Sequence, residues 1–112
     1  MPQSDLDLVR GTLDLLVLRT LAAGPLHGYA IAAQIKDRTE AAILVEEGAL
    51  YPALHRLEAR RWISAEWGWS ENNRKARYYS LTAAGRRELK AQTVLWRRYV
   101  TAVARVLAPH EA

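Results

Sequence analysis

The chain has 112 residues, a formal net charge of +4 and no cysteine. This length suits one compact domain, and the lack of cysteine excludes disulfides and thiolate metal sites. No apolar run is long enough to cross a membrane, and the acidic start does not resemble a signal peptide, so we expect a cytoplasmic protein without a membrane partner.

A helix is expected over residues 8–21, ended by Gly24-Pro25. Its apolar residues fall on two sides, which indicates burial in the core on one side and either the core or another chain on the other. The two stripes consist of Leu13, Leu16, Val17 and Leu21, and of Leu8, Leu15 and Leu18.

A second, shorter helix is expected over about residues 28–38, with Ile31 and Ile35 facing inward. Residues 39–46 form a connector, in which Ile43 and Val45 could pair briefly as a strand.

The stretch EEGALYPALHRLEARRWI predicts a third helix that begins near Gly48, since a proline such as Pro52 is tolerated in a first turn and costly later. Its apolar side carries four residues, and the opposite side is built mainly of small ones. The apolar residues are Leu50, Ala53, Leu54 and Leu57, and the opposite ones are Gly48, Pro52, His55 and Ala59. Tyr51 and Arg56 flank the outer side, so the backbone there can lie close to a partner.

A β-hairpin follows, with strands at 63–69 and 77–81. Asn72 and Asn73 favour a turn between them, and Arg74 and Lys75 place positive charge at its tip. The three nearby tryptophans are expected to anchor the strands; they are Trp62, Trp67 and Trp69.

A long helix is expected from an N-cap at Thr82 to about Leu107. Its residues repeat at alternating spacings of four and three, like a heptad seam. The seam is Gly85, Leu89, Gln92, Trp96, Tyr99, Val103 and Val106. It could pack on its own domain, but a second copy is the favoured partner, because the shorter helices already supply a core.

Three short helices, a hairpin and a long helix predict a mainly α (α+β) protein, a winged helix-turn-helix at 8–81 with a C-terminal dimerisation helix at 82–108. In such domains the third helix enters the major groove of DNA, and the hairpin, or wing, touches the flanking backbone or the minor groove. Tyr51, His55 and Arg56 could then bond phosphates or base edges, and Arg74 and Lys75 phosphates. The alternative is that Tyr51 packs at the core edge while the charged residues are simply solvated.

Four segments together resemble the PadR family of bacterial transcriptional regulators over roughly residues 8–108. They are GTLDLLVLRTL, GPLHGYAIAAQI, EEGALYPALHRLE and WISAEWGWSENNRKARYYSLTAAGR. The resemblance implies homodimeric winged-helix repressors whose C-terminal and first helices form the dimer interface. It also implies, for some members, phenolic acids or other aromatic compounds bound near that interface.

The resemblance maps the DNA-reading helix to Ala49–Arg60, the wing to Ser70–Arg77 and the start of the helix-turn-helix to His27-Gly28-Tyr29. Two positions depart from the family pattern: Ala49 replaces a frequent Ser or Thr, and Arg61 replaces a glycine that often ends the helix. The candidate DNA-binding residues are Tyr29, Ala49, Tyr51, Pro52, His55, Arg56, Asn73, Arg74, Lys75 and Arg77.

The candidate dimer interface combines the first helix with the heptad seam, in which Gln92 resembles a polar position that sets the register. It comprises Leu15, Leu18, Leu89, Gln92, Trp96, Tyr99, Val103 and Val106. Trp96 is also the candidate platform for an aromatic ligand, although simple packing at the interface is the more expected role.

The favoured hypothesis is a sequence-specific DNA-binding transcriptional regulator, a homodimeric repressor of an imperfect palindromic operator in double-stranded DNA, released by a small aromatic effector or another signal. The alternative is a winged-helix protein-interaction module that does not bind DNA. No catalytic triad, phosphate loop or carboxylate pair indicates an enzyme, and no cofactor is expected. His27 and His55 lack partners at metal-ligand spacing, so no metal site is expected, and His27 fits a local hydrogen bond.

Overall fold

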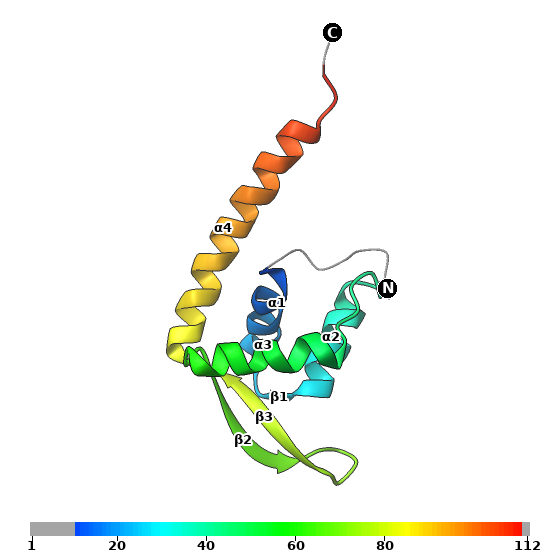
Figure 1. Ribbon diagram of the computed structural model, residues 1–112, viewed down its shortest axis with the longest axis vertical. Coiled ribbons are helices and arrows are strands. Elements are labelled where there is room, and N and C mark those ends of the chain that lie inside the picture. Colours follow the sequence, from blue (N-terminus) through cyan, green and yellow to red (C-terminus); the bar gives the residue numbers. More distant parts are fainter. Residues whose placement is uncertain (1–10, 111–112) are drawn as a thin grey trace.

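The computed structural model describes residues 11–110, and within this range it is an α+β winged helix, which confirms the predicted fold class (Figure 1). The sheet is antiparallel, with strand order β1-β3-β2. In chain order the elements are α1 (Thr12–Thr20), the 3₁₀ helix η1 (Leu21–Ala23), β1 (Leu26–His27), α2 (Gly28–Arg38), α3 (Glu47–Ala59), β2 (Ile63–Trp69), β3 (Lys75–Leu81) and α4 (Ala83–Leu107). Among the described helices, none combines the length and apolar character that a membrane span requires.

The core lies where α1, α2 and α3 meet the base of the sheet. Both predicted stripes of the first helix contribute to it, since Val17 and Leu18 are completely buried. Leu8, also predicted for the second stripe, lies outside the described residues. The buried hydrophobic residues are Leu13, Val17, Leu18, Leu21, Ile31, Ile35, Leu50, Ala53, Leu54, Leu57, Ile63 and Tyr79.

The second helix has the predicted bounds, and His27 caps it: its Nδ1 accepts a hydrogen bond from the Ala30 N–H at 3.1 Å. The connector after this helix contains no strand, so the pairing suggested for Ile43 and Val45 is wrong. The third strand is instead Leu26–His27, which pairs with the free edge of β3. Two residues are too short a strand to produce a periodic pattern in sequence.

The third helix begins at Glu47, one residue before the predicted start, and buries the predicted apolar side. Pro52, however, is its sixth residue and lies inside the helix rather than in its first turn. The missing N–H at Pro52 costs a hydrogen bond to the backbone four residues earlier. Packing of the buried side therefore outweighs the local preference of the proline.

The third helix ends in a Schellman motif, a helix end closed by a left-handed residue. The Trp62 N–H donates to the Leu57 carbonyl at 3.1 Å, and the Arg61 N–H donates to the Glu58 carbonyl at 2.9 Å. Arg61 supplies the left-handed conformation, with φ of 62°. The left-handed end of the helix therefore forms with an arginine, whose Cβ makes this conformation costlier than it is for glycine.

The direction in which α4 leaves the domain depends on contacts with the turn between α3 and β2. The Thr82 hydroxyl accepts from the Gly85 N–H at 3.0 Å, as an N-cap, and donates to the Arg61 carbonyl at 2.7 Å. The Thr82 N–H donates to the Trp62 carbonyl at 3.0 Å. A Cβ on Gly85 would collide with that same carbonyl oxygen, so glycine is needed for this close approach. We call this set of four residues the junction.

We predict that Gly85→Ala lowers the free energy of unfolding by about 1–3 kcal/mol, the usual cost of overpacking. Urea denaturation measures it. The matched control is Gly48→Ala on α3, where an added Cβ meets no atom within 4 Å. That substitution should leave stability unchanged or raise it by up to about 1 kcal/mol, because alanine is the better helix former. Equal effects at the two positions would contradict the close-approach argument.

We also predict that Arg61→Gly raises the free energy of unfolding by about 1 kcal/mol, because glycine adopts the left-handed conformation without the Cβ penalty. Thermal unfolding should show a higher midpoint. Arg60→Gly is the control, since Arg60 has right-handed helical angles and its guanidinium lies 5.0 Å from the Trp62 ring centroid. That variant should melt earlier; a lower midpoint for Arg61→Gly would refute the interpretation.

Candidate nucleic-acid interface

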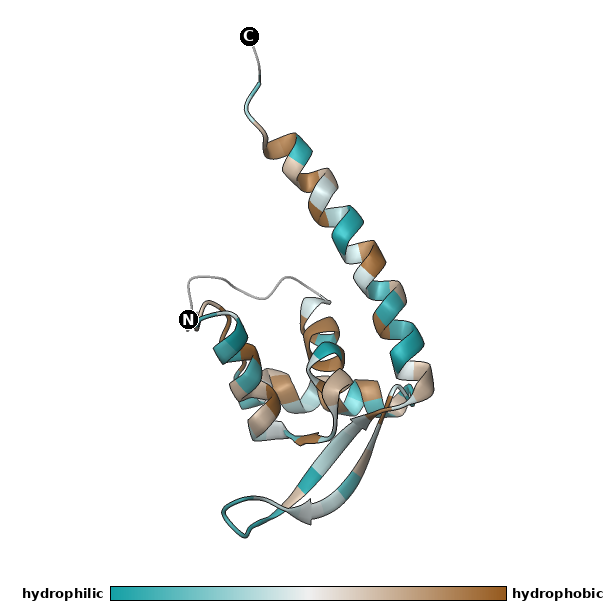
Figure 2. Cartoon of the chain, turned by 180° about the vertical axis from the view of Figure 1, so that it is seen from behind, coloured by the Kyte–Doolittle hydropathy of each residue, from teal (hydrophilic) through white to brown (hydrophobic). Residues whose placement is uncertain are grey.

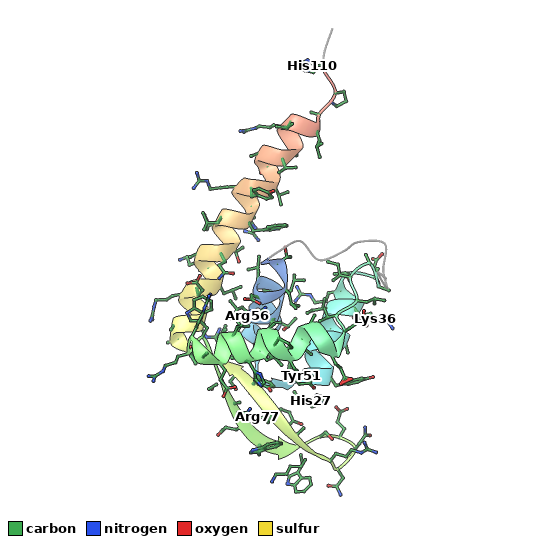
Figure 3. The ribbon with its side chains drawn as sticks, in the orientation of Figure 1. His27, Lys36, Tyr51, Arg56, Arg77 and His110 are labelled. Carbon is green, nitrogen blue, oxygen red and sulfur yellow. The ribbon has the colours of Figure 1, made fainter. Side chains whose placement is uncertain are left out.

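The wing and one edge of α3 enclose a groove of about 610 Å³. Residues from α2, α3 and both wing strands line it, so the fold brings together parts of the chain that lie far apart in sequence. They include Tyr29, Tyr51, His55, Arg74, Lys75 and Arg77, all predicted from sequence. Figure 3 shows Tyr51, His27 and Arg77 on this wing-facing side of α3.

The two flanks of the outer side of α3 have different surroundings. Tyr51 is 39% exposed and packs against the start of α2, where a Cβ on Gly28 would lie 2.6 Å from its hydroxyl oxygen. Arg56 lies on the side of α3 that faces α1 (Figure 3), and its Nη2 is 2.8 Å from Oδ1 of Asp14. Since its guanidinium is already paired and points away from the wing, we leave Arg56 out of the groove surface.

The wing is held to α3 by Arg77, whose Nη2 donates to Oε2 of Glu58 at 3.1 Å. The same guanidinium lies 5.9 Å from the ring centroids of Trp67 and Tyr79. Arg77 thus links the two walls of the groove, a role that the sequence did not indicate. One feature of the sequence could have indicated that Glu58 lies near this surface. It follows His55 by three residues, and this spacing places both residues on the same side of a helix.

The tip of the wing is an ordered turn. Asn73 has the left-handed conformation expected of it, with φ of 57°. The Ser70 N–H donates to the Arg74 carbonyl at 2.8 Å, and the Asn73 N–H donates to the Ser70 carbonyl at 2.9 Å. This turn leaves Arg74 and Lys75 exposed, and neither forms an ion pair within residues 11–110.

Tyr79 lies in the floor of the groove and is 3% exposed. Burial raises the pKa of its phenol above the usual value of 10.0, and the charge of Glu58 acts in the same direction, whereas Arg77 lowers it. The phenol therefore stays neutral at physiological pH, and the positive charge of the groove comes from Arg74, Lys75 and Arg77.

Other predicted residues lie at the margins of this surface. Ala49 and Pro52 are exposed on α3 beside the groove, and the groove-lining Tyr29 is 80% exposed at the start of α2. His27 is engaged as a helix cap, and the described residues contain no group of three acidic or histidine side chains that could hold a metal ion.

A second exposed surface runs along α4, the candidate dimerisation helix. Figure 2 shows hydrophobic residues recurring along it, and Figure 1 shows its C-terminal half extending away from the other elements. A groove of about 610 Å³ separates the middle of α4 from α1 and is lined by Leu15, Gln92, Leu95, Trp96 and Tyr99. The large hydrophobic residues exposed on α4 are Val94, Leu95, Tyr99, Val100, Val103, Val106 and Leu107.

The predicted interface residues do not all reach this surface. Leu18 is completely buried in its own core, so it has no area to offer a partner, and we leave it out. Leu89 packs against the edge of the core. Gln92 donates to Oε2 of Glu88 at 2.8 Å within α4. Leu95, at 60% exposed, was missed because it lies beside the heptad seam rather than in it.

A family model described as the transcriptional regulator PadR-like family matches residues 17–91. A transcriptional regulator from Clostridium thermocellum is 27% identical, with a TM-score of 0.81 and coverage of 88% of this chain and 96% of that one. A PadR family transcriptional regulator from Eggerthella lenta is 32% identical, with a TM-score of 0.76 and coverage of 90% and 86%. Uncharacterized protein X from Lysinibacillus sphaericus is 32% identical over 90 residues, 80% of this chain and 83% of that protein.

Proposed function

The chain belongs to the PadR-like family of transcriptional regulators, and from this premise we propose that it is a homodimeric repressor of an imperfect palindromic operator, released by a small aromatic ligand or another signal. One observation carries the proposal. The exposed edge of α3 and the basic tip of the wing line a single groove. In this proposal residues 8–81 bind DNA and residues 82–108 join two copies.

The chemistry of the groove suits a DNA duplex. Gly48 and Pro52 place no long side chain in the middle of the outer side of α3, so the backbone there can approach base edges in the major groove. Tyr51 and His55 at the rim can bond bases or phosphates, and Lys75 can bind phosphates of the flanking backbone. The proposed contact set is Tyr29, Ala49, Tyr51, Pro52, His55, Asn73, Arg74 and Lys75, with Arg77 holding the wing in place.

The apolar surface of α4 supports a second copy as partner. Tyr99 is 58% exposed and Val106 is 83% exposed, whereas monomeric proteins rarely expose contiguous apolar patches of this kind. A two-fold axis would bring the same surface of α4 on both copies together, with Leu15 of α1 at the margin. It would also place two α3 helices to read half-sites about one helical turn, ~34 Å, apart.

The groove between α1 and α4 gives the proposed effector a place to act. The rings of Trp96 and Tyr99 are 5.9 Å apart and tilted by 33°, and with Leu95 they form one aromatic and apolar wall. A flat aromatic molecule stacked there would move α4 against α1. Because the junction couples α4 to the end of α3, such a movement would change the spacing of the two reading helices. Packing of Trp96 against the partner copy is the competing role for this residue.

We predict that Arg74→Ala and Lys75→Ala each weaken DNA binding and lower the slope of log affinity against log salt by about 1, because each removes one phosphate contact. Fluorescence anisotropy would compare the duplex upstream of the protein's own gene with a shuffled duplex across a salt series. Arg56→Ala, outside the groove, is the matched control and should leave the slope unchanged. Failure of the unmodified protein to bind either duplex at low salt would favour the protein-interaction module.

We predict that sedimentation gives a dimer of the 12.6 kDa chain and that Val103→Glu shifts it toward monomer. A buried carboxylate in an apolar seam is costly. Arg105→Glu is the control, since two residues along a helix correspond to a rotation of about 200°, which puts Arg105 on the opposite side. A monomer at high concentration, or equal effects of the two variants, would exclude α4 as the interface.

A further inference from the structure

The wing exposes two of the tryptophans that were predicted to anchor its strands. Trp67 is 63% exposed and Trp69 is 67% exposed, so the expectation that they anchor the strands is wrong for both. They share one face of β2 with Ile63, which is buried, and Ala65, which packs against the core. Beyond Ala65 the strand extends past the core, and the side chains that continue its apolar face enter solvent. Two adjacent exposed indoles form a patch that calls for a partner.

Positive charges accompany these indoles on the same face. Trp67 pairs with Arg77 across the strands, and Trp69 pairs with Lys75. Nζ of Lys75 lies 5.1 Å from the Trp67 ring centroid, and Cζ of Arg77 lies 5.9 Å from it, within the range of cation–π attraction. The face therefore carries indoles and cations side by side, and Trp67 also lines the groove with Tyr51 and His55.

The other face of the wing has different chemistry. Glu66 pairs there with Tyr78, and Ser64 pairs with Ser80. The Tyr78 hydroxyl donates to the Trp69 carbonyl at 2.7 Å, and its ring closes over Gly68, where a Cβ would lie 2.9 Å from Cδ1. This face is polar, carries a carboxylate and is closed by its own side chains. A polyanion would be attracted to the tryptophan face and repelled by Glu66.

We propose that Trp67 and Trp69 are contact residues for double-stranded DNA, packing against the deoxyribose edges of the minor groove while Lys75 binds an adjacent phosphate. The inference rests on the proposed function. If α3 lies in the major groove, the wing lies over the neighbouring backbone, where apolar surface is offered by the sugars. Proteins that bind the minor groove commonly combine cations with apolar side chains. The tryptophans thus supply affinity that does not depend on salt.

The first test compares DNA affinity and its salt dependence for the full-length protein. Trp67→Ala combined with Trp69→Ala should weaken binding about tenfold, as expected when roughly 60 Å² of apolar surface is no longer buried, with the salt slope unchanged. Lys75→Ala should instead lower the slope. Ser64→Ala, on the opposite face of the same strand, is the control. A double variant that binds as tightly as the unmodified protein would overturn the proposal.

A second measurement keeps the test decisive if the double variant folds poorly. Protein labelled with 5-fluorotryptophan gives one fluorine resonance per tryptophan, assigned by single Trp→Phe variants. Saturation with the upstream duplex should shift the Trp67 and Trp69 resonances and reduce their solvent exposure, and leave Trp62 unchanged.

The outcomes separate failure of this inference from failure of the proposed function. Salt-dependent DNA binding without a change at Trp67 and Trp69 would overturn the inference and leave the regulator intact. No DNA binding by the unmodified protein would overturn both. If the fluorine resonances of Trp67 and Trp69 shift with protein concentration in the absence of DNA, the tryptophan face contacts a second copy. That result would also overturn the inference.

Discussion

The close approach of α4 to the end of α3, at the junction, is the constraint on which the rest of the structure depends. Two backbone carbonyls of the turn after α3 accept hydrogen bonds from Thr82, and the same residue caps α4. Gly85 lets the backbones meet there, and Arg61 takes a left-handed conformation to make the turn. The end of α3 and the start of α4 are therefore one hydrogen-bonded unit. We propose that the first of these helices reads DNA and that the second joins two copies. Any change in the direction of α4 must be transmitted to the end of α3 or break these bonds.

The groove surface depends on contacts that use some charged residues and leave others available. The guanidinium of Arg77 pairs with Glu58 and contacts the aromatic rings beside it, and Arg56 is paired with Asp14. Both pairs are partly exposed, so each adds little stability. Their effect is geometric: one holds the wing against α3, and the other fixes α3 against α1. Arg74 and Lys75, placed at the tip by an ordered turn, keep their charge for a partner.

The positive charge of the chain is unevenly distributed. The winged part, residues 11–82, is almost neutral, because carboxylates such as Glu46, Glu47 and Glu71 offset its cations. The helix α4 holds most of the excess, with Glu88 as its only carboxylate. Its cations are Arg86, Arg87, Lys90, Arg97, Arg98 and Arg105. The net positive charge of the chain thus lies mainly on α4, and at the proposed DNA surface the local arrangement of cations at the wing tip matters more than the total charge.

Local patterns in the sequence determined much of this protein. The period of buried residues in α3, the alternation in β2, the Thr82 cap and the asparagine turn depend on neighbours a few residues apart, so the helices, the wing and the fold class were predictable. The two-residue strand at Leu26–His27, the tolerance of Pro52 inside α3 and the complete burial of Leu18 were decided by packing between distant segments. The same holds for the ion pairs that turn Arg56 toward α1 and Arg77 toward α3, and for the exposure of Trp67 and Trp69 beyond the reach of the core. A pattern of spacing states which side chains share a face; only the tertiary structure decides what that face meets, because burial and ion pairing depend on residues far away in the chain.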